Sequence, residues 1–447
     1  MRFLRVRFSH ILRYYKNLFS FLLFGVLLLT PMFFSRAQTA VDIQNKINQN
    51  NANIQSLEQE IATYQSQLDS LGQQKSSLNG SLKELDLNKK KLDSNIAVIQ
   101  NKINATNLTI QNLSTDIGTK EDAIQTDINS ISLQMRNTNE LEQTSLLEDI
   151  LSQNNLSDSW NDIDNIVTVR ESLRADITKL QQVKGELEDT RTTTIAAKNE
   201  LTVLKSQLAD QQKIVMQNIS DKNLLLKQTK NNESSYQKLL QDRLAKKNAF
   251  EQELNNYEAQ LQFILDPSKL PQSRVLSWPL DKIYVTQLFG KTVDSKRLYV
   301  SGTHNGVDFR ASVGTPVMSM ADGTVMGTGN TDLTCPGASF GKFVFIKYNN
   351  GLSSTFGHLS LIKSNVGDLV KKGDVVGYSG STGYVTGPHL HVSLYASQAV
   401  KMASMPSAAC NGRIYTLPVS PINAYLNVLD YLPPYTVNTT TSNNQTD

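Results

Sequence analysis

Four of the five histidines of this chain lie between positions 304 and 391, and an aspartate follows the first of them by four residues. Imidazole nitrogens and carboxylate oxygens are ligands that Zn²⁺ prefers, and a catalytic zinc keeps three protein ligands and an open position for water. A single histidine is more often structural, but a group of this kind favours a metal site. The candidate residues are His304, Asp308, His358, His389 and His391.

The pair His389 and His391 flanks Leu390 in a short apolar run. Residues two apart on a β-strand point to the same face, so both imidazoles can converge on one site. One of them can bind the metal while the other contacts the water, and spacing alone leaves open which does which. The histidines therefore predict a catalytic zinc site that is held by strands.

The segment around these residues is rich in turns. No proline occurs between Pro31 and Pro267, and most glycines lie after Pro267. From Ser277 onward, short apolar runs alternate with glycines, as in residues 342–348 and 389–395, which is typical of strands and turns. We expect an all-β domain at residues 276–434, preceded by a linker at 266–275. The Thr- and Asn-rich residues 435–447 are expected to form a disordered tail.

Residues 41–145 repeat apolar side chains every seven positions, most clearly at Ile96, Ile103, Ile110, Ile117, Ile124 and Ile131. Such a repeat predicts a left-handed coiled coil. Helical periodicity returns after residue 167 and runs to about 265, so two arms of similar length flank an apolar break at 146–167. This pattern predicts an antiparallel α-helical coiled-coil hairpin at 38–265. Its tip at 146–167 either caps the hairpin or docks a membrane protein complex.

The first 37 residues have the pattern of a targeting segment. Basic residues precede an apolar run at 18–34, and Ser35 and Ala37 suit a signal peptidase. The run is at the short limit for spanning a bilayer, so a cleaved signal peptide and a retained anchor both stay open. Either one places residues 38–447 outside the cytoplasm, in the periplasm or at the cell surface. No cysteine follows the run, which excludes a lipoprotein anchor.

Two cysteines and a low charge complete the pattern. Cys335 and Cys410 are the only cysteines, and outside the cytoplasm an even pair is expected to form a disulfide. The alternative is two unrelated buried thiols. The formal net charge is +3, which argues against a nucleic-acid partner, because a phosphate-binding surface leaves a clear basic excess.

The spacing His-x-x-x-Asp followed by His-x-His resembles the lysostaphin-like zinc endopeptidases of peptidoglycan. The resemblance runs from Ser277 to Tyr395 and includes Ser277–Leu280, Thr286–Gly290, Gly314–Val317, Ala321–Val325, Gly373–Gly377 and Gly380–Gly383. It implies an antiparallel β barrel-sandwich with the metal in an open groove and peptidoglycan as the substrate. His304, Asp308 and His391 would be the Zn²⁺ ligands. His358 and His389 would be the catalytic pair that orients water and stabilises the oxyanion.

The sequence departs from the family pattern in two places. Phe356 stands where relatives often carry tyrosine, and the segments around Cys335 and Cys410 look longer than the family minimum, which leaves substrate choice open. The combination with a coiled coil also resembles the murein hydrolase activators of cell division, which have lost their zinc ligands and switch on separate amidases. A passive wall-binding module with a structural zinc is a third possibility. The complete ligand set favours a secreted hydrolase for cell-wall remodelling or cell separation.

Overall fold

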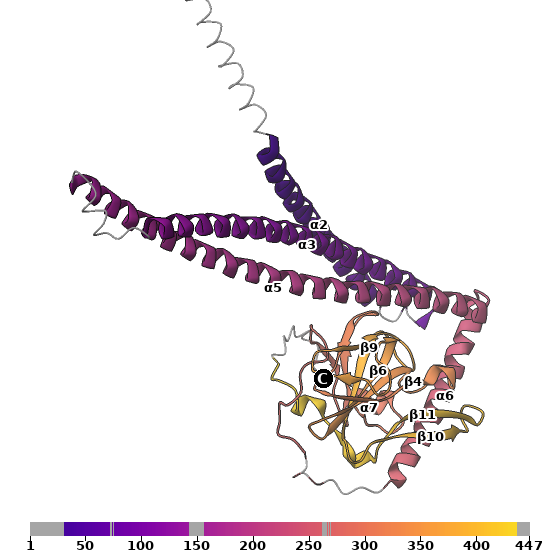
Figure 1. Ribbon diagram of the computed structural model, residues 1–447. Coiled ribbons are helices and arrows are strands. Elements are labelled where there is room, and N and C mark those ends of the chain that lie inside the picture. The colour runs from indigo at the N-terminus through magenta and orange to yellow at the C-terminus, as the bar shows by residue number, and fades with distance from the viewer. Residues whose placement is uncertain are drawn as a thin grey trace, which may run out of the picture. The chain divides into compact units, whose positions relative to one another are not determined.

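A computed structural model describes residues 31–71, 74, 76–142, 156–261, 266, 268 and 270–435. Within them, the first part of the chain forms four long helices (Figure 1): α2 (Pro31–Ser70), α3 (Leu78–Glu142), α5 (Leu156–Thr229) and α6 (Glu233–Gln260). None of the described helices is long and apolar enough to cross a membrane. Three predicted features fall at least partly outside the described residues: the targeting segment at 1–30, the hairpin region at 143–155, and the tail from 436. The docking of a membrane protein at the tip stays a prediction.

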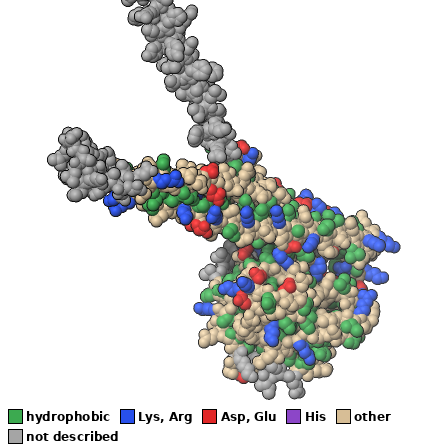
Figure 2. Space-filling model, in the orientation of Figure 1, with side chains coloured by type: hydrophobic (Ala, Val, Ile, Leu, Met, Phe, Trp, Pro, Cys, Tyr) green, Lys and Arg blue, Asp and Glu red, His purple; other side chains and the backbone are tan. Residues whose placement is uncertain are grey.

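The chain divides into two compact units, one made of residues 1–56 and 98–207 and the other of residues 57–97 and 208–447. In the first unit α3 and α5 run antiparallel, as shown by the contact of Gln134 with Asp176 at 2.7 Å and the ion pair of Arg191 with Glu121 at 2.9 Å. This arrangement confirms the predicted antiparallel helical region. Figure 2 shows basic and acidic side chains interspersed over the helices on the face that it displays.

The predicted N-terminal arm is not one helix. In the second unit, the end of α2 folds back on the start of α3, where Lys91 donates to Gln65 at 2.7 Å and Ser94 contacts Glu60. The sequence between the two helices contains Gly72, and glycine costs about 1 kcal/mol relative to alanine in a helix. A heptad row identifies the residues that face a partner, but not which helix is the partner.

The second arm is also broken. α5 ends at Thr229, Lys230 and Asn231 have left-handed φ angles of 51° and 54°, and α6 begins at Glu233. Asn232 caps α6 by accepting a hydrogen bond from the Ser235 amide at 3.2 Å. α6 packs against the β domain within the second unit instead of continuing the coiled coil, because its buried Phe250 and Glu258 contact Tyr415 and Tyr425 of that domain.

The β domain is antiparallel in every strand pair that the structure describes, in the order β1-β2-β9-β6-β5-β4-β7, with β12 beside β9, β8 beside β6, and β3 beside β8. A separate hairpin pairs β10 with β11. This confirms the predicted all-β fold. The strands are β1 (Val285–Gln287), β2 (Val307–Arg310), β3 (Pro316–Met318), β4 (Gly323–Asn330), β5 (Lys342–Tyr348), β6 (Leu352–Ile362), β7 (Leu369–Val370), β8 (Val375–Ser379), β9 (His389–Ala396), β10 (Lys401–Ser407), β11 (Arg413–Val419) and β12 (Tyr425–Leu426). Short helices lie at α7 (Val293–Leu298), η3 (Thr331–Leu333), η4 (Ile422–Ala424) and η5 (Val428–Asp430).

The main core explains which way the candidate residues point. Val307 and Phe309 on β2, and Leu390 and Val392 on β9, are 0% exposed and belong to one apolar cluster. Successive side chains of a strand alternate between faces, so the residues between them point to the opposite face. Asp308 and the two histidines of β9 are among these residues, and apolar alternation therefore positions the site.

A second cluster lies around the predicted disulfide. Cys335 and Cys410 are bonded, with their Cα atoms 5.5 Å apart, which confirms the expected bridge. The cluster also includes Phe250 of α6, whose ring centroid lies 4.5 Å from that of Tyr415 on β11. The bridge and α6 therefore stabilise the same side of the β domain.

Candidate metal centre

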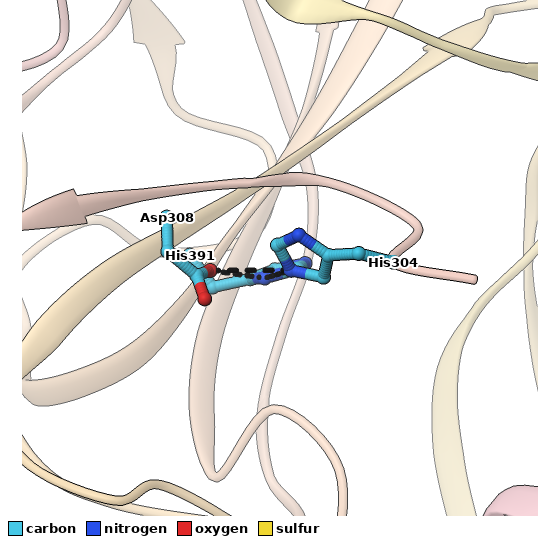
Figure 3. Close-up of side chains that lie close together, drawn as sticks. All are labelled: His304, Asp308 and His391. Atoms are coloured by element: carbon cyan, nitrogen blue, oxygen red, sulfur yellow. Dashed lines mark hydrogen bonds and ion pairs between the residues drawn. The ribbon is translucent and has the colours of Figure 1, made fainter. Parts of the chain in front are cut away.

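Three candidate ligands meet where β2 and β9 lie side by side. Asp308 on β2 is directly opposite His391 on β9, and His304, just before β2, forms an isolated bridge with Gly290. One ligand atom of each residue lies within 4.8 Å of the others (Figure 3), so the three could hold a metal ion. Strand register supplies two of these residues, and the turn before β2 supplies the third.

The three side chains are almost completely buried, with exposures of 0% for His304 and 5% for both Asp308 and His391. His391 Nδ1 lies 2.8 Å from Asp308 Oδ1, and His304 Nε2 lies 3.2 Å from His391 Nδ1 and 3.3 Å from Asp308 Oδ1. Gly306 allows this packing, because a Cβ atom there would lie 2.6 Å from the His391 ring.

Outer contacts fix how the rings present their nitrogens. His304 Nδ1 lies 3.0 Å from the Leu288 carbonyl, His358 Nδ1 lies 2.9 Å from the Thr382 carbonyl, and His389 Nδ1 lies 2.9 Å from the Gly387 carbonyl. A carbonyl oxygen only accepts, so each Nδ1 must donate, and in the neutral ring Nε2 carries the lone pair. Partners of this kind orient metal-binding histidines in proteins.

In His391 the two ring nitrogens have the opposite roles, with Nδ1 facing the centre. Its Nε2 contacts the Ser393 hydroxyl at 2.8 Å, while Nδ1 faces Asp308 and His304. If Nε2 donates to Ser393, the Nδ1 lone pair points at the same place as His304 Nε2 and the Asp308 carboxylate. His304 Nε2 and Asp308 Oδ1 then both present lone pairs at 3.3 Å, and a cation between them removes the repulsion. The donor set therefore fits a metal ion.

His358 and His389 flank this centre. Their ring centroids lie 4.7 Å apart, and that of His358 lies 5.7 Å from that of His391. His389 Nε2 lies 3.5 Å from Asp308 Oδ2, the carboxylate oxygen on the other side from His391. All five candidate residues thus lie in one place, although only His304, Asp308 and His391 form the tight ligand cluster.

A bulge in β6 aims His358 at the centre. The register of β5 with β6 shifts between Lys342 and Val344, and His358 adopts a left-handed φ of 60°. Its backbone amide donates to the Phe340 carbonyl at 2.7 Å. Bulges and non-glycine residues at positive φ are concentrated at functional sites, because surrounding contacts must maintain them. The sequence gives no signal for this strain.

Burial and mutual contacts shift the acid–base properties of the cluster. Burial alone would raise the pKa of Asp308, but its close contacts with the imidazoles of His304 and His391 hold that pKa well below its ordinary value. Burial lowers the pKa of His358 well below its usual range, with a contribution from His389 and His391, and burial also lowers the pKa of His391. An ionised carboxylate and neutral imidazoles are the forms that bind metal.

A hollow of about 280 Å³ opens beside the centre, with Asp308 and His389 in its wall. Gln287 of β1, Leu298 of α7 and Pro388 are among its other lining residues. Its position gives an extended ligand access to the side of the cluster where His389 lies.

Two residues that contact the candidate ligands were not predicted from the sequence. Ser393 fixes the His391 ring, and its position two residues further on the same strand face is a signal that was available. The Tyr299 ring stacks on His304, with centroids 5.1 Å apart and an interplanar angle of 10°. Nothing in the sequence marks Tyr299, because the α7 segment that carries it has no periodic pattern.

Comparison with known proteins identifies the class of this domain. Residues 302–402 match the model described as Peptidase family M23. The glycyl-glycine endopeptidase ALE-1 of Staphylococcus capitis is 43% identical over 91 residues, which cover 20% of this chain and 24% of that protein. The peptidoglycan DD-endopeptidase ShyA of Vibrio cholerae is 42% identical over 91 residues, which cover 20% of each.

A solved structure of the catalytic domain of lysostaphin from Staphylococcus simulans has 32% sequence identity, a TM-score of 0.23, and covers 26% of this chain and 81% of that one. The chain matches only about a quarter or less of the length of ALE-1 and ShyA. It carries a lysostaphin-like peptidase M23 domain, preceded by a helical region, and the resemblance drawn from the histidine spacing is confirmed.

Proposed function

We propose that the protein is a zinc-dependent endopeptidase that hydrolyses peptide bonds in bacterial peptidoglycan outside the cytoplasm, for cell-wall remodelling or cell separation. The convergence of His304, Asp308 and His391 within 4.8 Å supports this proposal most directly. Catalytic zinc sites use three protein ligands of this kind and leave further positions open. Similarity to ALE-1, which is named a glycyl-glycine endopeptidase, and to ShyA, which is named a peptidoglycan DD-endopeptidase, supports the substrate class.

In this proposal the three ligands hold Zn²⁺, which when bound supplies a Lewis acid for the peptide carbonyl and lowers the pKa of water. His358 and His389 keep Nε2 lone pairs, because their Nδ1 atoms donate to the carbonyls of Thr382 and Gly387. One of them accepts a proton from the attacking water at Nε2. The other orients the water, or stabilises the developing negative oxygen in its protonated form, in which Nε2 carries a proton and donates. The substrate peptide would enter by the hollow beside His389.

The second candidate function, an activator of separate murein amidases, is favoured by the helical region that precedes the domain. It predicts that the metal cluster has no catalytic use. The full set of five metal-site positions favours the enzyme. A passive module with a structural metal would give His358 and His389 no task.

The test uses the purified chain with isolated peptidoglycan, with and without a zinc chelator, and mass spectrometry of the released fragments. We expect hydrolysis that chelator abolishes and Zn²⁺ restores. Asp308→Ala should lose zinc and activity together, and His358→Ala should keep zinc and lose turnover. Digestion by metal-free protein would refute the proposal, as would zinc-loaded protein that cuts nothing but stimulates an added amidase.

A further inference from the structure

Helix α6 carries a lysine that is buried beside the metal centre. Lys247 is 1% exposed, although a lysine ammonium is almost never buried unless it has partners. Its ammonium donates to the Leu298 carbonyl and lies 3.1 Å from Glu251, one helical turn further on. The Tyr384 ring centroid lies 4.2 Å away and that of Tyr299 lies 5.4 Å away, both within the range of cation–π attraction.

Lys247 and Glu251 hold the chain on both sides of Tyr299. Lys247 binds the carbonyl of the residue before it, and Glu251 accepts from the Val300 amide after it at 3.4 Å. Between these two contacts, Tyr299 lays its ring flat on His304, at an interplanar angle of 10°. The position of this ring over a candidate metal ligand therefore depends on two residues of α6.

The same ammonium reaches the segment that orients the other histidines. Tyr384 lies between Thr382 and Gly387, whose carbonyls accept from His358 and His389. Lys247 thus contacts the 298–300 segment, whose Tyr299 ring stacks on His304, and the Tyr384 ring of the segment that orients His358 and His389. All of these residues belong to the second compact unit.

We propose that Lys247 and Glu251 are positioning residues of the metal site, which hold the 298–300 turn so that Tyr299 covers His304. Helix α6 is then part of the catalytic unit and not merely the last segment of the helical region. The inference rests on the proposed metal site. In this inference the contacts of α6 support activity. If α6 instead inhibited the site, weakening these contacts would raise activity.

The test measures Zn²⁺ affinity of the full chain by competition with a chromogenic chelator, beside the KM and kcat for a peptidoglycan peptide. Lys247→Met keeps most of the side-chain length and removes the charge. Loss of an outer contact of a metal ligand costs about 10–100-fold in affinity or activity, and we expect about 10-fold weaker zinc binding and a lower kcat. The matched control is Lys246→Met, since Lys246 is a half-exposed neighbour that pairs only with Asp242 in the described structure.

A double-mutant cycle separates positioning from general destabilisation. Tyr299→Leu should weaken zinc binding by a similar factor, and Lys247→Met should add little in that background. Circular dichroism of the metal-free proteins checks folding. If Lys247→Met does not fold, the isosteric variant Glu251→Gln replaces it in the test. Glu251→Gln should also weaken zinc binding.

Three results would overturn the inference: unchanged zinc affinity in Lys247→Met, fully additive effects with Tyr299→Leu, or faster hydrolysis by Lys247→Met, which would make α6 a restraint. Wild-type protein that binds no zinc would instead refute the proposed function, so the two failures are distinguishable.

Discussion

Replacing Glu258 by glutamine should stabilise the protein above pH 7. Glu258 lies near the end of α6, is 5% exposed, and accepts hydrogen bonds from the Tyr425 hydroxyl at 2.7 Å and the Ser420 amide at 3.4 Å. Burial raises the pKa of its carboxyl from 4.5 to about 7 despite these two bonds. A glutamine Oε1 can accept both bonds without carrying a charge.

The sign of the pH dependence follows from proton binding. Between pH 4.5 and about 7 the folded state holds a proton on Glu258 that the unfolded state has released, so the free energy of unfolding falls as pH rises through this interval. At about 1.4 kcal/mol for each pH unit, the difference between the two pKa values costs about 3 kcal/mol at pH 8. Burial raises the pKa of the neighbouring Tyr395, Tyr415 and Tyr425, so these groups stay neutral throughout.

The assay is urea unfolding at several pH values from 5 to 8, followed by tryptophan fluorescence in a Trp160→Phe background, in which Trp278 of the β domain is the remaining tryptophan. Glu258→Gln should match the wild type near pH 5 and exceed it by up to about 3 kcal/mol at pH 8. Glu200→Gln, an exposed change on α5, is the control and should leave the free energy of unfolding nearly unchanged. If Glu258→Gln is no more stable than the wild type at pH 8, then burial of the ionised Glu258 carboxylate does not destabilise the folded protein.

Three further predictions concern the centre and the bridge. Gly306→Ala should displace the His391 ring, because the new Cβ would lie 2.6 Å from it, and zinc affinity measured by chelator competition should fall. Ser393→Ala should weaken zinc binding by about 10-fold or more with the fold retained, and undiminished affinity would contradict the proposed orientation of His391. Replacing Cys335 and Cys410 by serine should cost about 4 kcal/mol in the chain-entropy model, measured by urea unfolding against the disulfide-bonded wild type.

The sequence predicted that the candidate metal ligands converge, because residue type marks them and strand alternation brings them together. Asp308 and His391 face the same way because apolar neighbours alternate with them on β2 and β9. His358 is different, since it reaches the centre through a bulge and a left-handed φ that no residue pattern announces. The contact of Tyr299 with His304 is likewise a tertiary contact between segments that share no periodic signal.

The helical region shows the same limit on a larger scale. Its heptad rows correctly predicted helices and an antiparallel pairing, as Arg191 and Glu121 show. They did not predict that α2 folds back on α3 or that α6 leaves the bundle, because an apolar stripe can pack against any complementary surface. Phe250 packs on Tyr415 of the β domain and would serve equally well in a coiled coil.

The polar residues of α6 explain why this helix has one position on the β domain. Besides Lys247, Glu253 accepts from the Ser407 hydroxyl at 2.7 Å and the Ala409 amide at 2.8 Å, and Glu258 accepts from Tyr425. Apolar contacts alone tolerate sliding of a helix by small steps, whereas a buried charge that misses its partner costs several kcal/mol. The burial of Glu258 is costly at neutral pH, but together with Lys247 and Glu253 it fixes the register of α6. That register places Lys247 beside Tyr299, whose ring stacks on His304, so α6 belongs to the same compact unit as the predicted domain at residues 276–434.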